Sequence, residues 1–135
     1  ITPGEIRGID ITTQPFPGFP TDLQAPFMAL LATAQGTSVI TEKIYENRMQ
    51  HVAELQRMGA SIRVQSNTAV VEGVSALSGA PVNGTDLRAS AAMVLAALVA
   101  TGKSQVSGLD HLDRGYADIE AKLGRAGAKL IRRTP

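Results

Sequence analysis

Hydrophobic and polar positions alternate along the chain with two different periods. Period-two alternation predicts strands over residues 5–11 and 38–41, whereas helical spacing predicts helices near residues 22–34 and 48–58. Gly59 follows the second helix at the position where a left-handed C-terminal cap is expected. The apolar face of that helix is formed by Met49, Val52, Leu55 and Met58. The order of elements is therefore βαβα, which is typical of an α/β fold.

Two further apolar runs, residues 61–64 and 69–71, flank the polar residues 65–68. This pattern predicts a β-hairpin that completes a βαβαββ unit over residues 1–75. A second unit is predicted over residues 76–135.

The second unit is predicted because the landmarks of the first return in the same order. Residues 21–25, Thr-Asp-Leu-Gln-Ala, recur at residues 85–89 as Thr-Asp-Leu-Arg-Ala, and each run opens an apolar helical stretch that ends before a glycine. The paired landmarks that follow are Gly36 and Gly102, Arg48 and Arg114, and Gly59-Ala60 and Gly127-Ala128.

The second copy starts near residues 80–82 and is predicted to end with a single hairpin strand, residues 128–132, before Pro135. Its closing strand either comes from elsewhere or belongs to a longer native chain. The chain begins Ile1-Thr2-Pro3 without an initiator Met and without a recognisable signal peptide, which indicates a processed or truncated piece of something longer. The open sheet edge predicts self-association.

Composition excludes several classes of function. A net charge of +1 and only three Phe and two Tyr provide neither a basic stripe nor a stacking platform, so no nucleic-acid partner is expected. The longest apolar run, residues 89–100, is well short of the roughly 20 residues that span a bilayer and reads as a buried helix. No cysteine is present, which excludes thiolate chemistry.

Arginines stand where three helices are predicted to start. If Thr85 caps its helix, Arg88 is the third helical residue, where Glu or Gln would complete a capping box; Gln24 fits that role in the first copy. A first-turn cation opposes the helix dipole. Arg48 and Arg114 repeat the choice, so the three are expected to converge on a phosphate or carboxylate. The alternative is that each pairs with a nearby acid, namely Asp86, Asp113 or Glu46.

Asp22 follows a loop, residues 14–20, that contains three prolines, and Pro26 comes four residues later. Either the helix begins near Asp22 or it begins with Pro26 as its first residue. Both alternatives place Asp22 at a strand-to-helix turn, where α/β proteins bind ligands. His51 and His111 lack a second ligand at metal spacing, so each is expected to be solvated or hydrogen-bonded and not to bind zinc.

Five motifs closely resemble the UDP-N-acetylglucosamine enolpyruvyl transferases (1-carboxyvinyltransferases). In order, they cover residues 17–22 (PGFPTD), 46–48 (ENR), 57–60 (RMGA), 85–90 (TDLRAS) and 111–116 (HLDRGY). The resemblance covers essentially the whole chain but only about the C-terminal third of such an enzyme. It implies two domains, each an inside-out α/β barrel of three βαβαββ units, of which this chain carries about two units of one domain.

The resemblance also implies an activity: transfer of the enolpyruvyl group of phosphoenolpyruvate to the 3-hydroxyl of UDP-N-acetylglucosamine, for peptidoglycan synthesis in the bacterial cytoplasm, with no membrane, metal or organic cofactor. It matches Asp22 to a base at that hydroxyl and Ile44 to an apolar residue whose main chain contacts the sugar. It matches Asp86 to a carboxylate near the reacting centre. The arginines at the phosphoenolpyruvate end are Arg48, Arg88 and Arg114.

The family's proton-donating Cys or Asp loop, its N-terminal Lys-Asn pair and most uridine contacts belong to sequence outside this chain. The missing N-terminal part of the same protein is therefore an expected partner, and the chain alone is expected to be inactive. The alternative function is a non-enzymatic anion-binding or assembly module of the same fold.

Overall fold

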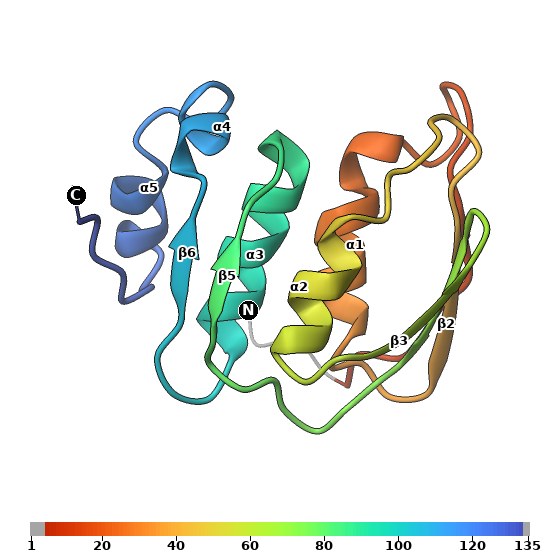
Figure 1. The fold of residues 1–135 in the computed structure, drawn as a ribbon, viewed down its shortest axis with the longest axis horizontal. Coiled ribbons are helices and arrows are strands. Elements are labelled where there is room, and N and C mark those ends of the chain that lie inside the picture. Colours follow the sequence, from red (N-terminus) through yellow and green to blue (C-terminus); the bar gives the residue numbers. More distant parts are fainter. Residues whose placement is uncertain (1–4, 134–135) are drawn as a thin grey trace.

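The computed structural model describes residues 5–133, so Ile1-Thr2-Pro3 and Pro135 lie outside it (Figure 1). The first unit comprises β1 (Ile11–Thr12), the 3₁₀ turn η1 (Thr21–Leu23), α1 (Gln24–Leu31), β2 (Thr37–Thr41), α2 (His51–Arg57), β3 (Ser61–Gln65) and β4 (Thr68–Glu72). The second comprises β5 (Pro81–Asn83), α3 (Leu87–Val99), β6 (Gln105–Ser107), α4 (Leu109–Asp113) and α5 (Ile119–Arg125). The βαβαββ order of the first unit is confirmed.

Two sheets flank the three helices α1, α2 and α3. The first has the strand order β1-β2-β4-β3, with β1 parallel to β2 and β4 antiparallel to both of its neighbours, and the second pairs β5 with β6 in parallel. The four-stranded sheet flanks α1 and α2, while β5 and β6 lie against α3 (Figure 1). Helices packed against one another inside the sheets are the arrangement that the inside-out barrel prediction requires.

The core is built from one face of each strand and the facing sides of three helices. In the first sheet, Ile40, Ile62 and Val71 point inward and are buried, as the period-two alternation predicts. Helices α1, α2 and α3 supply Met28, Leu55 and Met93, which are fully buried. Their burial removes the largest apolar side chains from water and fixes how the helices sit between the sheets.

Helix α3 confirms the helix predicted at residues 89–100, but that helix is not buried all round. Ala92, Met93 and Ala96 are buried, whereas Leu95 and Val99 are exposed on its other face. α3 packs on α1, α2, α4, β5 and β6, and the side that carries Leu95 and Val99 is left uncovered. Among the described residues, no helix is long and apolar enough to cross a membrane.

The ends of the helices agree with the predicted glycine cap but not with the predicted start of α2. Gly59 has a φ of +94°, the left-handed conformation predicted for it, and its counterpart Gly127 has a φ of +102°, so both copies end an amphipathic helix with a left-handed residue. Helix α2 begins at His51 and not at Arg48, because Asn47 at φ +58° interrupts the helical path and leaves Arg48 in a turn.

The start of α1 fits neither predicted alternative. Thr21–Leu23 form a 3₁₀ turn, and α1 begins at Gln24, so Pro26 is its third residue. The first amides of a helix have no intrahelical acceptor, which is why a proline is tolerated there. Asp22 nevertheless lies at the strand-to-helix turn, as both alternatives required.

Two strand predictions were wrong in extent or in kind. Of residues 5–11, only Ile11 belongs to a strand, and Arg7 forms an isolated bridge with Gln35. Residues 128–132 form no strand in the described part of the chain. Instead, the Arg132 guanidinium binds Asp113 and Glu120, which ties this segment to α4 and α5.

The outer edge of β6 is open. The Gln105 N–H donates to the Ala80 carbonyl, and the Ser107 carbonyl accepts from the Gly84 N–H, so these two residues bond toward β5. The backbone groups of Val106 therefore face the other way, where no strand of residues 5–133 pairs with them. Self-association through this edge remains a prediction.

Candidate functional site

A small hollow forms where the start of α1, the turn before α2 and the start of α3 meet. It contains residues from both copies of the repeat: Thr21, Gln24, Ala25, Arg48, His51, Asp86, Arg88 and Ala89. Its volume is about 10 Å³, the space of a single water molecule. The predicted site residues Arg48, Asp86 and Arg88 thus meet here.

Asp22 lies at the rim of this hollow between two arginines. The Arg88 Nε donates to Asp22 Oδ1 at 2.5 Å, and the Arg48 Nη1 is 3.8 Å from the same oxygen. The Asp22 side chain is 65% exposed, whereas those of Arg48 and Arg88 are 23% and 35% exposed. The alternative, in which each arginine pairs with a nearby acid, is therefore wrong for both, since they share a carboxylate 26 and 66 positions away.

Arg48 is held from a second side. Its guanidinium carbon lies 3.9 Å from the centre of the Tyr45 ring, and its Nη1 donates to the Thr21 hydroxyl at 3.4 Å. A cation over an aromatic face is attracted by the ring's negative surface. The side chain is thus directed toward Asp22 rather than into solvent.

The start of α3 differs by one residue from the prediction. Asp86, and not Thr85, is the N-cap, and its Oδ1 accepts from the Ala89 N–H at 2.9 Å. Arg88 is therefore the second helical residue, still within the first turn, where a cation is disfavoured by the dipole. The carboxylate of Asp22 offsets that penalty.

Arg114 does not stand at a helix start. It follows α4 as the C-cap, where the dipole favours a cation, because residues 109–113 form a helix that the first copy lacks. Asp113 binds Arg132 at 2.8 Å, so the alternative pairing of Asp113 with Arg114 is also wrong. Gly115 packs against Leu87, which places this end of α4 beside the start of α3. Within residues 5–133, no ion pair joins Arg114 to Asp22.

Glu42 is the buried acid of the site, and sequence reasoning missed it. It follows β2 directly, is 3% exposed, and accepts from five donors. These are the Thr13 hydroxyl (2.6 Å), the Thr21 hydroxyl (2.7 Å), the Gln24 amide (3.2 Å) and the N–H groups of Ile44 (3.0 Å) and Tyr45 (3.4 Å). Burial would raise the pKa of Glu42, but the hydrogen bonds from Thr13, Thr21, Ile44 and Gln24 outweigh it and lower that pKa. A charged residue immediately after an apolar strand was the available signal.

Two other residues take different roles because of Glu42. Gln24 does not complete a capping box, since its amide donates to Glu42 and to the Arg48 carbonyl. Ile44 uses its N–H for Glu42, so only its carbonyl oxygen and its half-buried side chain are left for a ligand.

His51 is neither solvated nor hydrogen-bonded through Nε2, contrary to the prediction. The residue is 4% exposed, and Nε2 is buried without a partner. Burial lowers the pKa of His51 to about 4, although the charges of Asp86 and Glu42 act to raise it. The imidazole is therefore neutral at pH 7. Among the described residues, no group of three potential ligands could hold a metal ion.

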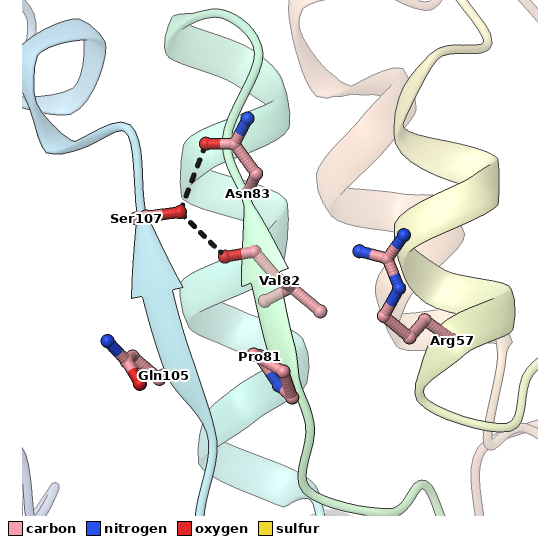
Figure 2. A pocket seen from close by; sticks show the side chains of 6 residues that line it. All are labelled: Arg57, Pro81, Val82, Asn83, Gln105 and Ser107. Atoms are coloured by element: carbon pink, nitrogen blue, oxygen red, sulfur yellow. Dashed lines mark hydrogen bonds between the residues drawn. The ribbon is translucent and has the colours of Figure 1, made fainter.

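A second hollow, of about 320 Å³, lies on the outer face of β5 and β6 (Figure 2). The Ser107 hydroxyl lies within hydrogen-bond distance of two acceptors there, the Val82 carbonyl (3.3 Å) and Asn83 Oδ1 (3.2 Å). The charged group on its wall is Arg57, which binds Glu54 at 2.6 Å. The described residues that line this hollow include no acid, and Arg57 is already paired, so the hollow beside Asp22 is the better candidate for chemistry.

Helices enclosed by sheets, in βαβαββ order, define the enolpyruvyl transferase fold. The crystal structure of the enolpyruvyl transferase NikO from Streptomyces tendae aligns with a TM-score of 0.84 and 31% identity, covering 93% of this chain and 29% of that one. An EPSP synthase from Acinetobacter baumannii aligns with a TM-score of 0.55 and 20% identity over 64% of this chain and 21% of that one, which shows the fold alone.

Residues 2–123 match the family of EPSP synthase (3-phosphoshikimate 1-carboxyvinyltransferase), and the chain belongs to this family. Curated relatives from Synechococcus sp. (strain CC9605) and Prochlorococcus marinus (strain MIT 9313) are 74% and 73% identical over all 135 residues. Both are named UDP-N-acetylglucosamine 1-carboxyvinyltransferase, and the chain spans 31% of their length. The predicted resemblance is confirmed, and the non-enzymatic alternative is not favoured.

Proposed function

We propose that this chain forms part of a transferase that moves the enolpyruvyl group of phosphoenolpyruvate to the 3-hydroxyl of UDP-N-acetylglucosamine, a step of peptidoglycan synthesis. The observation that carries the proposal is the placement of Asp22 between Arg48 and Arg88, which come from different copies of the repeat. One carboxylate and two guanidinium groups provide a proton acceptor beside an anion site. The names of the curated relatives support the choice of acceptor sugar.

Anion binding is assigned to the arginines. Arg88 and Arg48 both face Asp22 Oδ1, and the hollow between them has room for about one water. A phosphate or carboxylate would accept from the N–H groups that now face Asp22. The hollow would widen as it bound, because the Asp22 side chain at the rim is largely exposed and free to move aside. Asp22 would then be released toward the sugar hydroxyl. Arg114, beside the start of α3, is proposed to complete the anion site.

The proposed reaction proceeds by addition and then elimination, and Asp22 acts in the addition step. The oxygen of the 3-hydroxyl bonds to the central carbon of phosphoenolpyruvate while its proton passes to Asp22. The methylene carbon takes up a proton from a donor outside this chain. The central carbon then loses phosphate, which leaves with the bonding electrons, and the methyl group loses a proton to restore the double bond.

Asp86 and Ile44 are proposed to position the reactants. The α3 cap uses Oδ1 of Asp86, and Asp86 also lines the hollow beside Asp22. Ile44 is proposed to contact the sugar through its carbonyl oxygen, because Glu42 holds its N–H. No metal or organic cofactor takes part in the proposed reaction.

A full-length test protein allows this function to be measured. We define it as the Synechococcus sp. (strain CC9605) relative with these 135 residues in place of its matching segment, which is 74% identical. It should release phosphate from phosphoenolpyruvate only when UDP-N-acetylglucosamine is present. The 135-residue chain alone should release none, since the opposed groups that exclude water are absent.

The family match also names the acceptor to use as a control. The description of the matching family, 3-phosphoshikimate 1-carboxyvinyltransferase, contains the name 3-phosphoshikimate. That compound should therefore replace UDP-N-acetylglucosamine in a parallel assay. Phosphate release with 3-phosphoshikimate but not with the nucleotide sugar would assign the sister reaction instead. Release with neither would contradict the proposal.

A further inference from the structure

Glu42 connects the two segments that carry the proposed site. We propose that Glu42 is a positioning residue, whose buried carboxylate sets the places of Arg48 and Asp22 through Thr21, Gln24 and the loop after β2. The inference rests on the proposed function. At 3% exposed, Glu42 acts through its neighbours and not on a ligand.

The first connection runs through a hydroxyl group next to Asp22. The Thr21 hydroxyl donates to Glu42 Oε1 at 2.7 Å, and the Thr21 hydroxyl oxygen accepts from Arg48 Nη1 at 3.4 Å. A hydroxyl has one proton, and an ionised carboxylate can only accept. Glu42 therefore turns the Thr21 proton inward, which leaves a lone pair for Arg48.

The second connection holds the backbone of the same arginine. The Gln24 amide donates to Glu42 Oε1 at 3.2 Å and to the Arg48 carbonyl at 3.0 Å. Glu42 Oε2 accepts from the Tyr45 N–H, and the Tyr45 ring lies under the Arg48 guanidinium. Both ends of Arg48 are thus located by partners of one carboxylate.

An amide at position 42 could not replace that carboxylate. Glu42 Oε2 faces the backbone N–H groups of Ile44 and Tyr45, which cannot accept, so a glutamine would place its NH₂ at Oε1. There it would meet the Gln24 amide as donor against donor and would turn the Thr21 proton toward Arg48. The Arg48 side chain would lose its acceptor and its fixed position.

The test compares Glu42→Gln, Thr21→Val and the double variant in the full-length test protein. Glu42→Gln should lower kcat/KM by about 10- to 100-fold, as loss of an orienting partner typically does. The KM for phosphoenolpyruvate should rise more than that for UDP-N-acetylglucosamine, because Arg48 faces the anion. Glu42→Asp keeps the charge and should lose less. Glu72→Gln, at an exposed position at the end of β4, is the matched control and should leave activity unchanged.

A merely structural role would produce additive losses. The double variant should lose little more than Glu42→Gln alone, because both changes break one path to Arg48. Additive losses, or a Glu42→Gln variant within twofold of the parent, would overturn the inference. If Glu42→Gln does not fold, Thr21→Val decides, and an unchanged KM for phosphoenolpyruvate then refutes it.

Calorimetric titration with inorganic phosphate separates this inference from the proposed function. An inactive parent protein would contradict the function, yet Glu42→Gln should still weaken phosphate binding relative to Glu72→Gln. Equal binding by both variants would overturn the role of Glu42 even in an active enzyme.

Discussion

Lowering the pH from 7 to 5 should destabilise the folded chain by about 2 kcal/mol through His51 alone. The cause is the position of His51 beside the hollow next to Asp22, where the imidazole is buried and Nε2 has no partner. Burial lowers the pKa of His51 from 6.5 to about 4, against the opposing effect of Asp86 and Glu42. In the unfolded chain, the same imidazole becomes protonated near its ordinary pKa.

The sign follows from which state binds the proton first. Below pH 6.5 the imidazole binds a proton in the unfolded chain, whereas in the folded chain it does so only near pH 4. The free energy of unfolding therefore decreases as the pH is lowered from 6.5 to about 4. At pH 5 the unfolded state gains a factor of about 30, and at pH 7 almost none, which gives the figure of about 2 kcal/mol. Glu42, whose pKa is lowered from 4.5, adds its own loss only at still lower pH.

The perturbation is His51→Gln, because an amide fills part of the same space and takes up no proton. Urea unfolding of the 135-residue chain, followed by circular dichroism at pH 7, 6 and 5, should show a flatter pH dependence in this variant. His111→Gln is the matched control, since it removes the other histidine of the sequence and should keep the parent's dependence.

Nuclear magnetic resonance gives a direct check on the same group. The imidazole resonance of His51, assigned by its loss in His51→Gln, should barely move between pH 7 and pH 5. A midpoint at or above pH 6.5 would refute the reasoning, and so would a His51→Gln variant that loses as much stability on acidification as the parent.

Three other predictions concern the site and the sheet. In the full-length test protein, Asp22→Asn should fold normally and lose roughly 10²- to 10⁴-fold in kcat, as loss of a general base does, whereas a near-normal kcat would reduce Asp22 to a partner of the arginines. Arg48→Ala and Arg88→Ala should each weaken calorimetric phosphate binding and reduce its dependence on salt; equal binding by these variants and the exposed control Arg63→Ala would mean that the arginines form no anion site. The 135-residue chain should associate with rising concentration in light scattering, and Val106→Pro, which removes an outward N–H of β6, should reduce the association; a strictly monomeric parent would contradict the open-edge prediction.

The sequence alone was sufficient wherever the determining interactions are local. The polar run between two apolar strands predicted the β3–β4 hairpin, and Gly59 was recognised as a helix end because its lack of a Cβ suits the left-handed conformation. The repeat of Thr-Asp-Leu at residues 21 and 85 identified the two helix starts that line the hollow. Asp22 was predicted at a strand-to-helix turn because it follows the proline-containing loop of residues 14–20 and precedes the apolar helical stretch.

Where interactions cross the fold, local patterns were insufficient. The repeat paired Arg114 with Arg48, yet an additional helix, α4, puts Arg114 at a C-terminus while Arg48 lies in a turn. The predicted strand at residues 128–132 failed because no described strand pairs with it there, and Arg132 binds Asp113 and Glu120 instead.

Only the tertiary structure showed how the site is assembled. Asp22 and Arg88 are 66 positions apart and meet because α1 packs on α3. Glu42 reads in sequence as an ordinary charged residue after a strand, and its five donors come from separate segments that packing alone brings together. Helix and turn preferences act over a few residues, whereas the place of a buried charge depends on which distant donors the whole fold supplies to it.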